Sequence, residues 1–235
     1  MKKRYPVVIV EGLIGAGKTT LSRELGVALG PNTLTLTEPD EKNNANPYLD
    51  DYYADKKRWS LTMQLHLLGL RFRMHQDAQW HAMNNRGPVI MDRSYYGDTS
   101  FARVQAKLGL MSDREFETYA NIYHSMTASV LLPTVCVRIL VSPETCNERI
   151  SKRMQDEKGR RCETSIDLNY LRSLDMEIDH MTSVLRHQGV AILDVPYDVD
   201  RDTPQQRFQL TSSLAARINA IEPPDYFLDL HRRTL

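Results

Sequence analysis

The stretch from residue 6 to residue 20, PVVIVEGLIGAGKTT, constrains the fold more than any other part of the sequence. Its first five residues are apolar and rich in β-branched side chains, which predicts a strand over Pro6 to Val10 that is buried on both faces. Gly12 to Thr19 then completes the pattern G-x-x-x-x-G-K-[ST], and a helical run from Thr19 to Leu29 follows. In this order, glycine-rich backbone N–H groups can surround a phosphate while the helix points its positive end at the same place. The stretch therefore predicts a binding loop for a nucleoside triphosphate.

Two side chains at the end of this loop carry its chemistry. Lys18 can reach the outer phosphates, and the hydroxyl of Thr19 can ligate Mg²⁺. A chance match in a glycine-rich turn is the alternative, and the predicted strand and helix on either side argue against it.

Composition narrows the class of protein. The chain of 235 residues has 30 Lys and Arg and 30 Asp and Glu, so no net charge favours nucleic acid or a membrane surface. The three cysteines have no C-x-x-C spacing, which argues against a zinc site or a disulfide framework and fits a reducing compartment. No room for a signal peptide precedes the first predicted strand, and no apolar run approaches the ~20 residues of a membrane span. We expect a cytoplasmic protein with neither a nucleic-acid nor a membrane partner.

Strands and helices alternate along the rest of the chain. Short apolar runs predict four further strands, at residues 33–36, 89–91, 134–140 and 190–195. Apolar spacing and capping signals predict helices over 47–54, 58–81, 99–108, 112–132, from 143 onward, 168–185 and 204–220. This alternation predicts an α/β fold with a five-stranded parallel sheet covered by helices on both sides.

Acids and arginines follow two of these strands. Ligands bind at the carboxyl ends of strands in open α/β sheets, and Glu38 follows the strand at 33–36. A carboxylate there can accept a proton from an attacking hydroxyl; its alternative role is to cap a turn. Asp92 and Arg93 follow the strand at 89–91 and can hold Mg²⁺ and neutralise a transferring phosphoryl group. A surface ion pair is the alternative for these two.

Further arginines, at positions 149, 153, 160 and 161, surround a polar stretch that follows the predicted helix at 143. Their guanidinium groups can close over phosphates as a lid. A solvated helix end explains the same pattern.

Six landmarks fall in the same order as in a known family: EGLIGAGKTT, TEPD, NPYLDDYYADKKRWSLTMQ, MDRSYYGD, SPETCNERI and the run from Arg160 through Glu163 to Tyr170. With them the chain resembles the deoxynucleoside kinase family, and most closely its microbial deoxyadenosine and deoxyguanosine kinases. The resemblance covers residues 6 to about 195. It implies a P-loop NTPase-type three-layer fold in one domain over residues 1–235, with an arginine-rich lid at about 149–165 and an irregular tail at about 222–235.

The resemblance also implies an activity and its partners. The expected reaction is ATP-dependent phosphorylation of the 5′-hydroxyl of a small-molecule deoxynucleoside, with Mg²⁺ as the metal and a homodimer as the assembly. Glu38 matches the general base, Arg93 the arginine on the reacting oxygen, and Asp92 its acidic partner near Mg²⁺ on Thr19. The positions implied for ATP are Gly12, Leu13, Ile14, Gly15, Ala16, Gly17, Lys18, Thr19, Thr20, Arg149, Arg153 and Arg160.

The positions implied for the deoxynucleoside are Tyr53 and Glu163 on the sugar 3′-hydroxyl, and Met63, Gln64, Arg71 and Asp98 around the base. Gln64 and Arg71 lie seven residues apart, which is two turns along one helix face. An arginine–aspartate pair beside a glutamine resembles kinases of purine deoxynucleosides and deoxycytidine, and we expect a purine. A structural Arg71–Asp98 ion pair that ignores the base is the alternative.

Two rival functions share the phosphate-binding loop. A nucleoside monophosphate kinase of the thymidylate kinase type needs cations for the phosphate of its acceptor, whereas this chain offers Glu38, which suits a neutral hydroxyl. A non-catalytic accessory subunit is the other rival, and the retention of Lys18, Glu38 and Arg93 argues against it.

Overall fold

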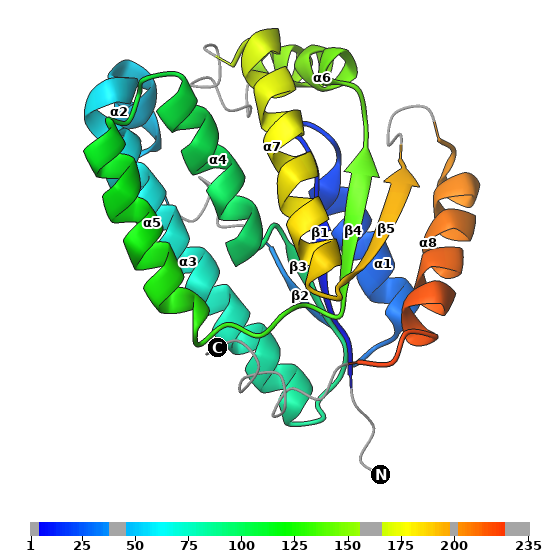
Figure 1. Ribbon diagram of the computed structural model, residues 1–235. Helices are drawn as coiled ribbons and strands as arrows, with labels where there is room; N and C mark the ends of the chain where they lie inside the picture. The colour runs from blue at the N-terminus through cyan, green and yellow to red at the C-terminus, as the bar shows by residue number, and fades with distance from the viewer. Residues whose placement is uncertain (1–4, 38–45, 156–165, 198–201, 224–235) are drawn as a thin grey trace.

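The computed structural model describes residues 5–37, 46–155, 166–197 and 202–223, without the side chains of 154 and 155. Their centre is a five-stranded sheet in the order β2-β3-β1-β4-β5. The strands are β1 (Val7–Glu11), β2 (Leu34–Leu36), β3 (Val89–Asp92), β4 (Val135–Leu140) and β5 (Ala191–Pro196). Every neighbouring pair is parallel, as predicted, so all five strands end at the same edge of the sheet (Figure 1).

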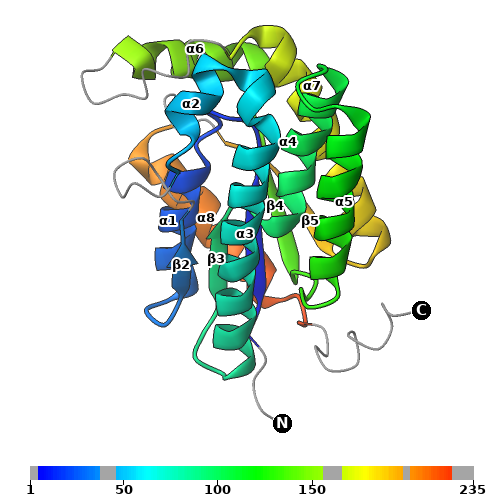
Figure 2. The ribbon, with the colours of Figure 1, turned by 90° about the vertical axis from the view of Figure 1, so that its left-hand side faces the viewer.

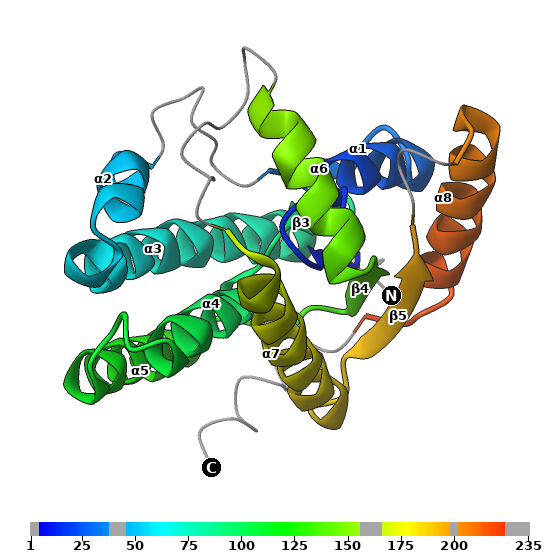
Figure 3. The same ribbon diagram turned by 90° about the horizontal axis from the view of Figure 1, so that it is seen from above.

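Helices cover both faces of the sheet. On one face α1 (Lys18–Leu29) packs against α8 (Pro204–Asn219). On the other face lie α3 (Lys56–Met83), α4 (Tyr95–Lys107) and α7 (Leu168–His187), with α5 (Asp113–Thr127) packed outside α3 and α4 (Figure 2). The short α2 (Leu49–Ala54) and α6 (Pro143–Gln155) lie at the carboxyl ends of the strands, where Figure 3 shows α6 crossing above the sheet.

The core consists of the three central strands and the helix faces packed on them. β1 is buried along its whole length, which explains why its sequence is continuously apolar rather than alternating. Each fully buried Val, Ile or Leu contributes roughly 1.5–3 kcal/mol through the apolar surface it removes from water. The fully buried aliphatic side chains of these strands are Val8, Ile9, Val10, Val89, Ile90, Val135 and Val137.

Two helix boundaries differ substantially from the prediction. α4 begins at Tyr95 rather than Thr99, because the Ser94 hydroxyl accepts a hydrogen bond from the backbone N–H of Gly97 (3.0 Å) and caps the helix. The earlier start of α4 places Asp98 inside its first turn.

α5 ends at Thr127 rather than Leu132. Glutamines on α3 hold the following segment by its backbone: Gln79 Oε1 accepts from the N–H of Leu131 (3.0 Å), and the Gln76 and Gln79 amides donate to the Ser129 carbonyl.

Among the described residues, no helix is both long and apolar enough to cross a bilayer.

The turn before β3 depends on a glycine. Gly87 has a φ of 156°, and a Cβ atom built there would clash with the Asn32 carbonyl group. This close approach lets the turn lie beside the start of β2, where the Leu34 N–H donates to the Pro88 carbonyl (2.9 Å).

Gly87→Ala should therefore lower the free energy of unfolding by roughly 3 kcal/mol or more, from backbone strain and the clash together. Urea unfolding monitored by circular dichroism measures the change. Gly109→Ala is the matched control: its φ of 68° is also left-handed, but a Cβ there meets no atom within 4 Å. That variant should lose only about 1–2 kcal/mol, and equal losses in the two variants would contradict the role of the Asn32 contact.

Candidate active site

The phosphate-binding loop lies between β1 and α1, at the carboxyl edge of the sheet. Gly15 and Gly17 adopt left-handed φ values of 81° and 93°, which glycine accommodates without strain. No side chain of the described residues caps α1, and its first turn holds no acid, so the first N–H groups of the helix remain available to a ligand. Lys18 is 7% exposed, and its Nζ donates to the Leu13 carbonyl (2.6 Å), which holds the ammonium group beside the loop. This geometry suits a phosphate chain.

Thr19 and Asp92 meet beside this loop. The Thr19 hydroxyl donates to Asp92 Oδ2 at 2.5 Å, and Asp92 is 2% exposed, so the alternative of a surface ion pair is wrong for this acid. Its second oxygen, Oδ1, has no hydrogen-bond partner among the described residues. A hydroxyl, a buried carboxylate oxygen and neighbouring phosphates are the hard oxygen ligands that Mg²⁺ prefers. The two residues therefore fit the predicted Mg²⁺ site.

Arg93 follows Asp92 and leaves the sheet in an unusual conformation. Its φ is 69°, one of the two positive values among the described non-glycine residues. The guanidinium is 5% exposed, lies 3.5 Å from the Gly12 carbonyl, and stacks 4.6 Å from the centre of the Phe101 ring. The fold thus directs a positive charge toward the phosphate-binding loop rather than toward solvent.

Glu11, the last residue of β1, is a buried carboxylate that the sequence reasoning missed. One of its oxygens accepts from the Ser94 hydroxyl at 2.5 Å. Burial raises the pKa of Glu11, and the nearby Arg93 guanidinium opposes that rise. The signal was present, because Glu11 ends a buried strand as Asp92 does.

α6 covers the phosphate-binding loop from above. The Arg149 guanidinium donates to the Gly15 carbonyl (3.4 Å), and a Cβ on Gly15 would lie 2.9 Å from the Cys146 carbonyl oxygen. Arg153 lies one turn further along the same helix. Arg160 and the rest of the predicted lid from residue 156 to residue 165 fall outside the described residues.

A cavity opens next to the loop, between α2, α3, α4 and the start of α7. Its empty volume is about 750 Å³ including the open space at its mouth. Ile14 of the phosphate-binding loop and Arg93 form one part of its wall, and Gln64 and Arg71 of α3 form another. Its remaining lining residues are Asn46, Leu49, Tyr52, Tyr53, Lys56, Met63, Leu67, Phe101, Gln105, Ile166 and Tyr170.

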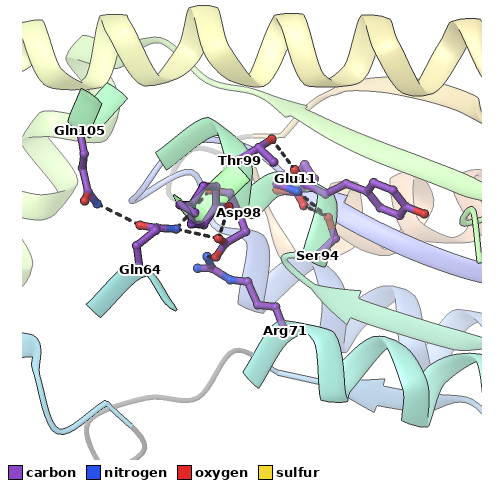
Figure 4. Close-up of polar contacts among 10 residues, drawn as sticks. Glu11, Gln64, Arg71, Ser94, Asp98, Thr99 and Gln105 are labelled. Carbon is purple, nitrogen blue, oxygen red and sulfur yellow. Dashed lines mark hydrogen bonds and ion pairs between the residues drawn. The ribbon is translucent and has the colours of Figure 1, made fainter. Parts of the chain in front are cut away.

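Asp98 organises the α3–α4 side of this cavity (Figure 4). It is fully buried, forms an ion pair with Arg71, and accepts hydrogen bonds on Oδ2 from the Gln64 amide (2.8 Å) and the Tyr119 hydroxyl (2.6 Å). The pKa of Tyr119 is raised well above its usual value, first by burial and then by the Asp98 charge. The predicted pairing of Arg71 with Asp98 is therefore present.

The structure assembles most of the predicted substrate positions and adds others. Tyr53, Met63, Gln64 and Arg71 line the cavity, and Asp98 lies behind its wall. Glu38 and Glu163, the predicted base and the predicted sugar ligand, lie outside the described residues. Sequence reasoning assigned no role to the cavity residues Tyr52, Lys56, Phe101, Gln105 and Tyr170, or to Tyr119 behind them.

Comparison with known proteins identifies a family that matches most of the chain. The family model for deoxynucleoside kinase matches residues 8–219. A deoxyadenosine kinase of Dictyostelium discoideum is 33% identical over 220 residues, which are 93% of this chain and 84% of that protein. A deoxyguanosine kinase of the same organism is 36% identical over 190 residues, which are 80% of this chain and 63% of that protein.

A solved structure supports the fold. The deoxyadenosine kinase of M. mycoides with bound dATP superposes with a TM-score of 0.71, at 24% identity, over 89% of this chain and 99% of its own. The predicted P-loop NTPase-type three-layer architecture is thereby confirmed. Taken together with the family match over residues 8–219, these likenesses establish that the chain is a phosphotransferase enzyme of the deoxynucleoside kinase family.

Proposed function

We propose that this protein transfers the γ-phosphoryl group of ATP to the 5′-hydroxyl of a purine deoxynucleoside. One observation carries the proposal: the same cavity is lined by Ile14 of the phosphate-binding loop, by Arg93, and by Gln64 and Arg71 of α3. A deoxynucleoside in this cavity would have its 5′-oxygen toward the donor phosphates and its base toward the amide and the guanidinium.

ATP binds through the loop from Gly12 to Thr20, with Lys18 on the outer phosphates and the arginines of the lid closing over them. Arg149 already contacts the loop, and Arg153 and Arg160 are assigned to the same role. Mg²⁺, when held by Thr19 and Asp92, neutralises charge on the phosphates. Arg93 stabilises the charge that develops between donor and acceptor.

Glu38 accepts the proton of the 5′-hydroxyl as the phosphoryl group is transferred. The pairing of the preceding strands supports this role. Leu36 at the end of β2 pairs with Met91 of β3, so both strands end at the edge of the sheet where Arg93 lies. Tyr53 and Glu163 hold the sugar 3′-hydroxyl, and Met63 packs near the base. Exclusion of water by the lid limits hydrolysis of ATP.

A purine is favoured because the relatives named above are a deoxyadenosine and a deoxyguanosine kinase. The proposal includes deoxycytidine as a further substrate, since a deoxyadenosine/deoxycytidine kinase of Bacillus subtilis is 31% identical over 178 residues. The Gln64, Arg71 and Asp98 group offers polar partners to each of these bases.

The working assembly is a homodimer of single-domain chains in the cytoplasm. Exposed apolar side chains on the packed α4 and α7 favour pairing through this side: Leu108 after α4 is 52% exposed, and Met176 and Val184 on α7 are 68% and 43% exposed. Burying such side chains against a second copy would remove apolar surface from water.

With ATP as donor, deoxyadenosine or deoxyguanosine should give the highest kcat/KM among the four common deoxynucleosides, and thymidine the lowest. Steady-state kinetics measures kcat/KM for each of the four deoxynucleosides, and the corresponding nucleoside 5′-monophosphates serve as control acceptors. A clear preference for thymidine would contradict the purine assignment, and faster phosphorylation of a monophosphate would contradict the assigned acceptor.

Glu38→Ala should lower kcat by about 10²- to 10⁴-fold because the general base is lost. ATP affinity, measured by calorimetric titration, should change less than about threefold, since Glu38 is not assigned to the donor. The exposed Glu117 on α5 supplies a matched control, Glu117→Ala, which should leave both quantities unchanged. An undiminished kcat in the Glu38 variant would remove the general-base role.

Arg71→Met should destabilise the fold by roughly 3–5 kcal/mol because it leaves the buried Asp98 carboxylate without its cation. The double variant Arg71→Met/Asp98→Asn should recover much of that loss in urea unfolding. If Arg71 recognises the base, the double variant should still lose at least about 10-fold in kcat/KM for purine deoxynucleosides. Recovery of both stability and kcat/KM would instead assign the pair a purely structural role.

A further inference from the structure

Gln105 lies seven residues after Asp98, two turns along the same face of α4. The side chain is 1% exposed, yet it forms part of the wall of the substrate cavity. α3 presents Gln64 and Arg71 at the same spacing, so the two helices each contribute a pair of polar residues to one place. Figure 4 shows Gln105 and Gln64 directed toward one another from these two helices.

The orientation of both amides follows from Asp98. Its carboxylate and its backbone carbonyl accept hydrogen bonds only, and Gln64 Nε2 donates to both, at 2.8 and 3.2 Å. Gln64 must therefore direct its NH₂ group at Asp98 and its oxygen away. Gln105 Nε2 donates to that oxygen at 3.0 Å, which in turn fixes the Gln105 amide.

These hydrogen bonds leave the side-chain oxygen of Gln105, a residue of the cavity wall, as an unused acceptor. Gln105 Oε1 is buried and has no hydrogen-bond partner among the described residues. A buried amide oxygen without a partner costs free energy that a ligand N–H group can recover. The Gln64 oxygen, which has already accepted one hydrogen bond, retains capacity for a second. Both glutamines line the cavity assigned to the base, so its wall contains two neighbouring residues with acceptor capacity to spare.

We propose that Gln105 is a specificity-determining residue whose Oε1 accepts a hydrogen bond from an exocyclic amino group of the purine. The inference rests on the proposed function, because it takes this cavity to hold the base. Among the purine deoxynucleosides, it predicts selection for those that carry an amino group on the ring over analogues that lack it.

The test removes the amino group from the substrate and the acceptor from the protein, singly and together. Two substrate pairs differ by the amino group: deoxyguanosine with deoxyinosine, and deoxyadenosine with purine 2′-deoxyriboside. In the unsubstituted enzyme, loss of the amino group should lower kcat/KM by about 10- to 100-fold in at least one pair, mainly through KM. In Gln105→Met, which has similar volume but no acceptor, that penalty should shrink at least about fivefold.

Gln76→Met supplies the matched control, since Gln76 is a half-buried glutamine on α3 that donates to the Ser129 carbonyl (2.9 Å) and is absent from the cavity wall. It should leave the penalty unchanged. Thermal unfolding checks that each variant is folded, and if Gln105→Met is not, Gln105→Leu replaces it. If neither replacement folds, the unsubstituted enzyme alone decides, because equal kcat/KM within both substrate pairs would overturn the proposal.

An amino-group penalty that is the same in the unsubstituted enzyme and in Gln105→Met would also overturn the proposal while leaving the kinase assignment intact. Absence of phosphorylation of every deoxynucleoside by the unsubstituted enzyme would instead refute the proposed function. Calorimetric binding of the same nucleosides gives a readout independent of turnover, and it should show the same penalty and the same loss of it in Gln105→Met.

Discussion

The buried Asp98 carboxylate is the interaction on which the α3–α4 side of the cavity depends. A charge removed from water must be matched by a cation and by hydrogen-bond donors, or it destabilises the fold. Here Arg71 and Gln64 from α3 and the Tyr119 hydroxyl from α5 satisfy it. One side chain therefore ties three helices together and at the same time determines which polar atoms the cavity presents. The packing of these helices and the polar lining of the cavity are therefore coupled at this point.

Parallel strands impose the second constraint, because they bring distant parts of the chain to one edge. The phosphate-binding loop after β1 and the Asp92–Arg93 pair after β3 become neighbours for this reason alone. Within the cavity, the Phe101 ring contacts an arginine from each of its two parts, Arg93 beside the phosphate-binding loop and Arg71 on α3. Its ring lies 4.6 Å from the Arg93 guanidinium and 5.4 Å from that of Arg71. One aromatic ring thus makes favourable contacts with two guanidinium groups.

The sequence predicted the sheet, the loop between β1 and α1, and the position of Asp92 at the end of β3, because each depends on local patterns or on strand polarity. The boundary of α4 was misplaced since Ser94 fits both a loop after a strand and a helix cap. Glu11 was overlooked although the rule used for Asp92 applies to it. Tyr119 could not be found this way, because its contact with Asp98 depends on how α5 packs, and no spacing along the chain encodes that. The spacing of seven residues between Asp98 and Gln105 could have indicated that both lie on one helix face. That Gln105 Oε1 has no hydrogen-bond partner among the described residues is visible only in the structure.

The backbone of Arg93 has a consequence for any effort to improve this protein. A non-glycine residue at a φ of 69° stores about 1–3 kcal/mol of strain, which glycine at the same position would relieve. A screen that selects for stability alone would therefore favour glycine at position 93 and would lose the guanidinium that lies beside the phosphate-binding loop. Under the catalytic role proposed for Arg93, stability and turnover place opposite requirements on this one residue.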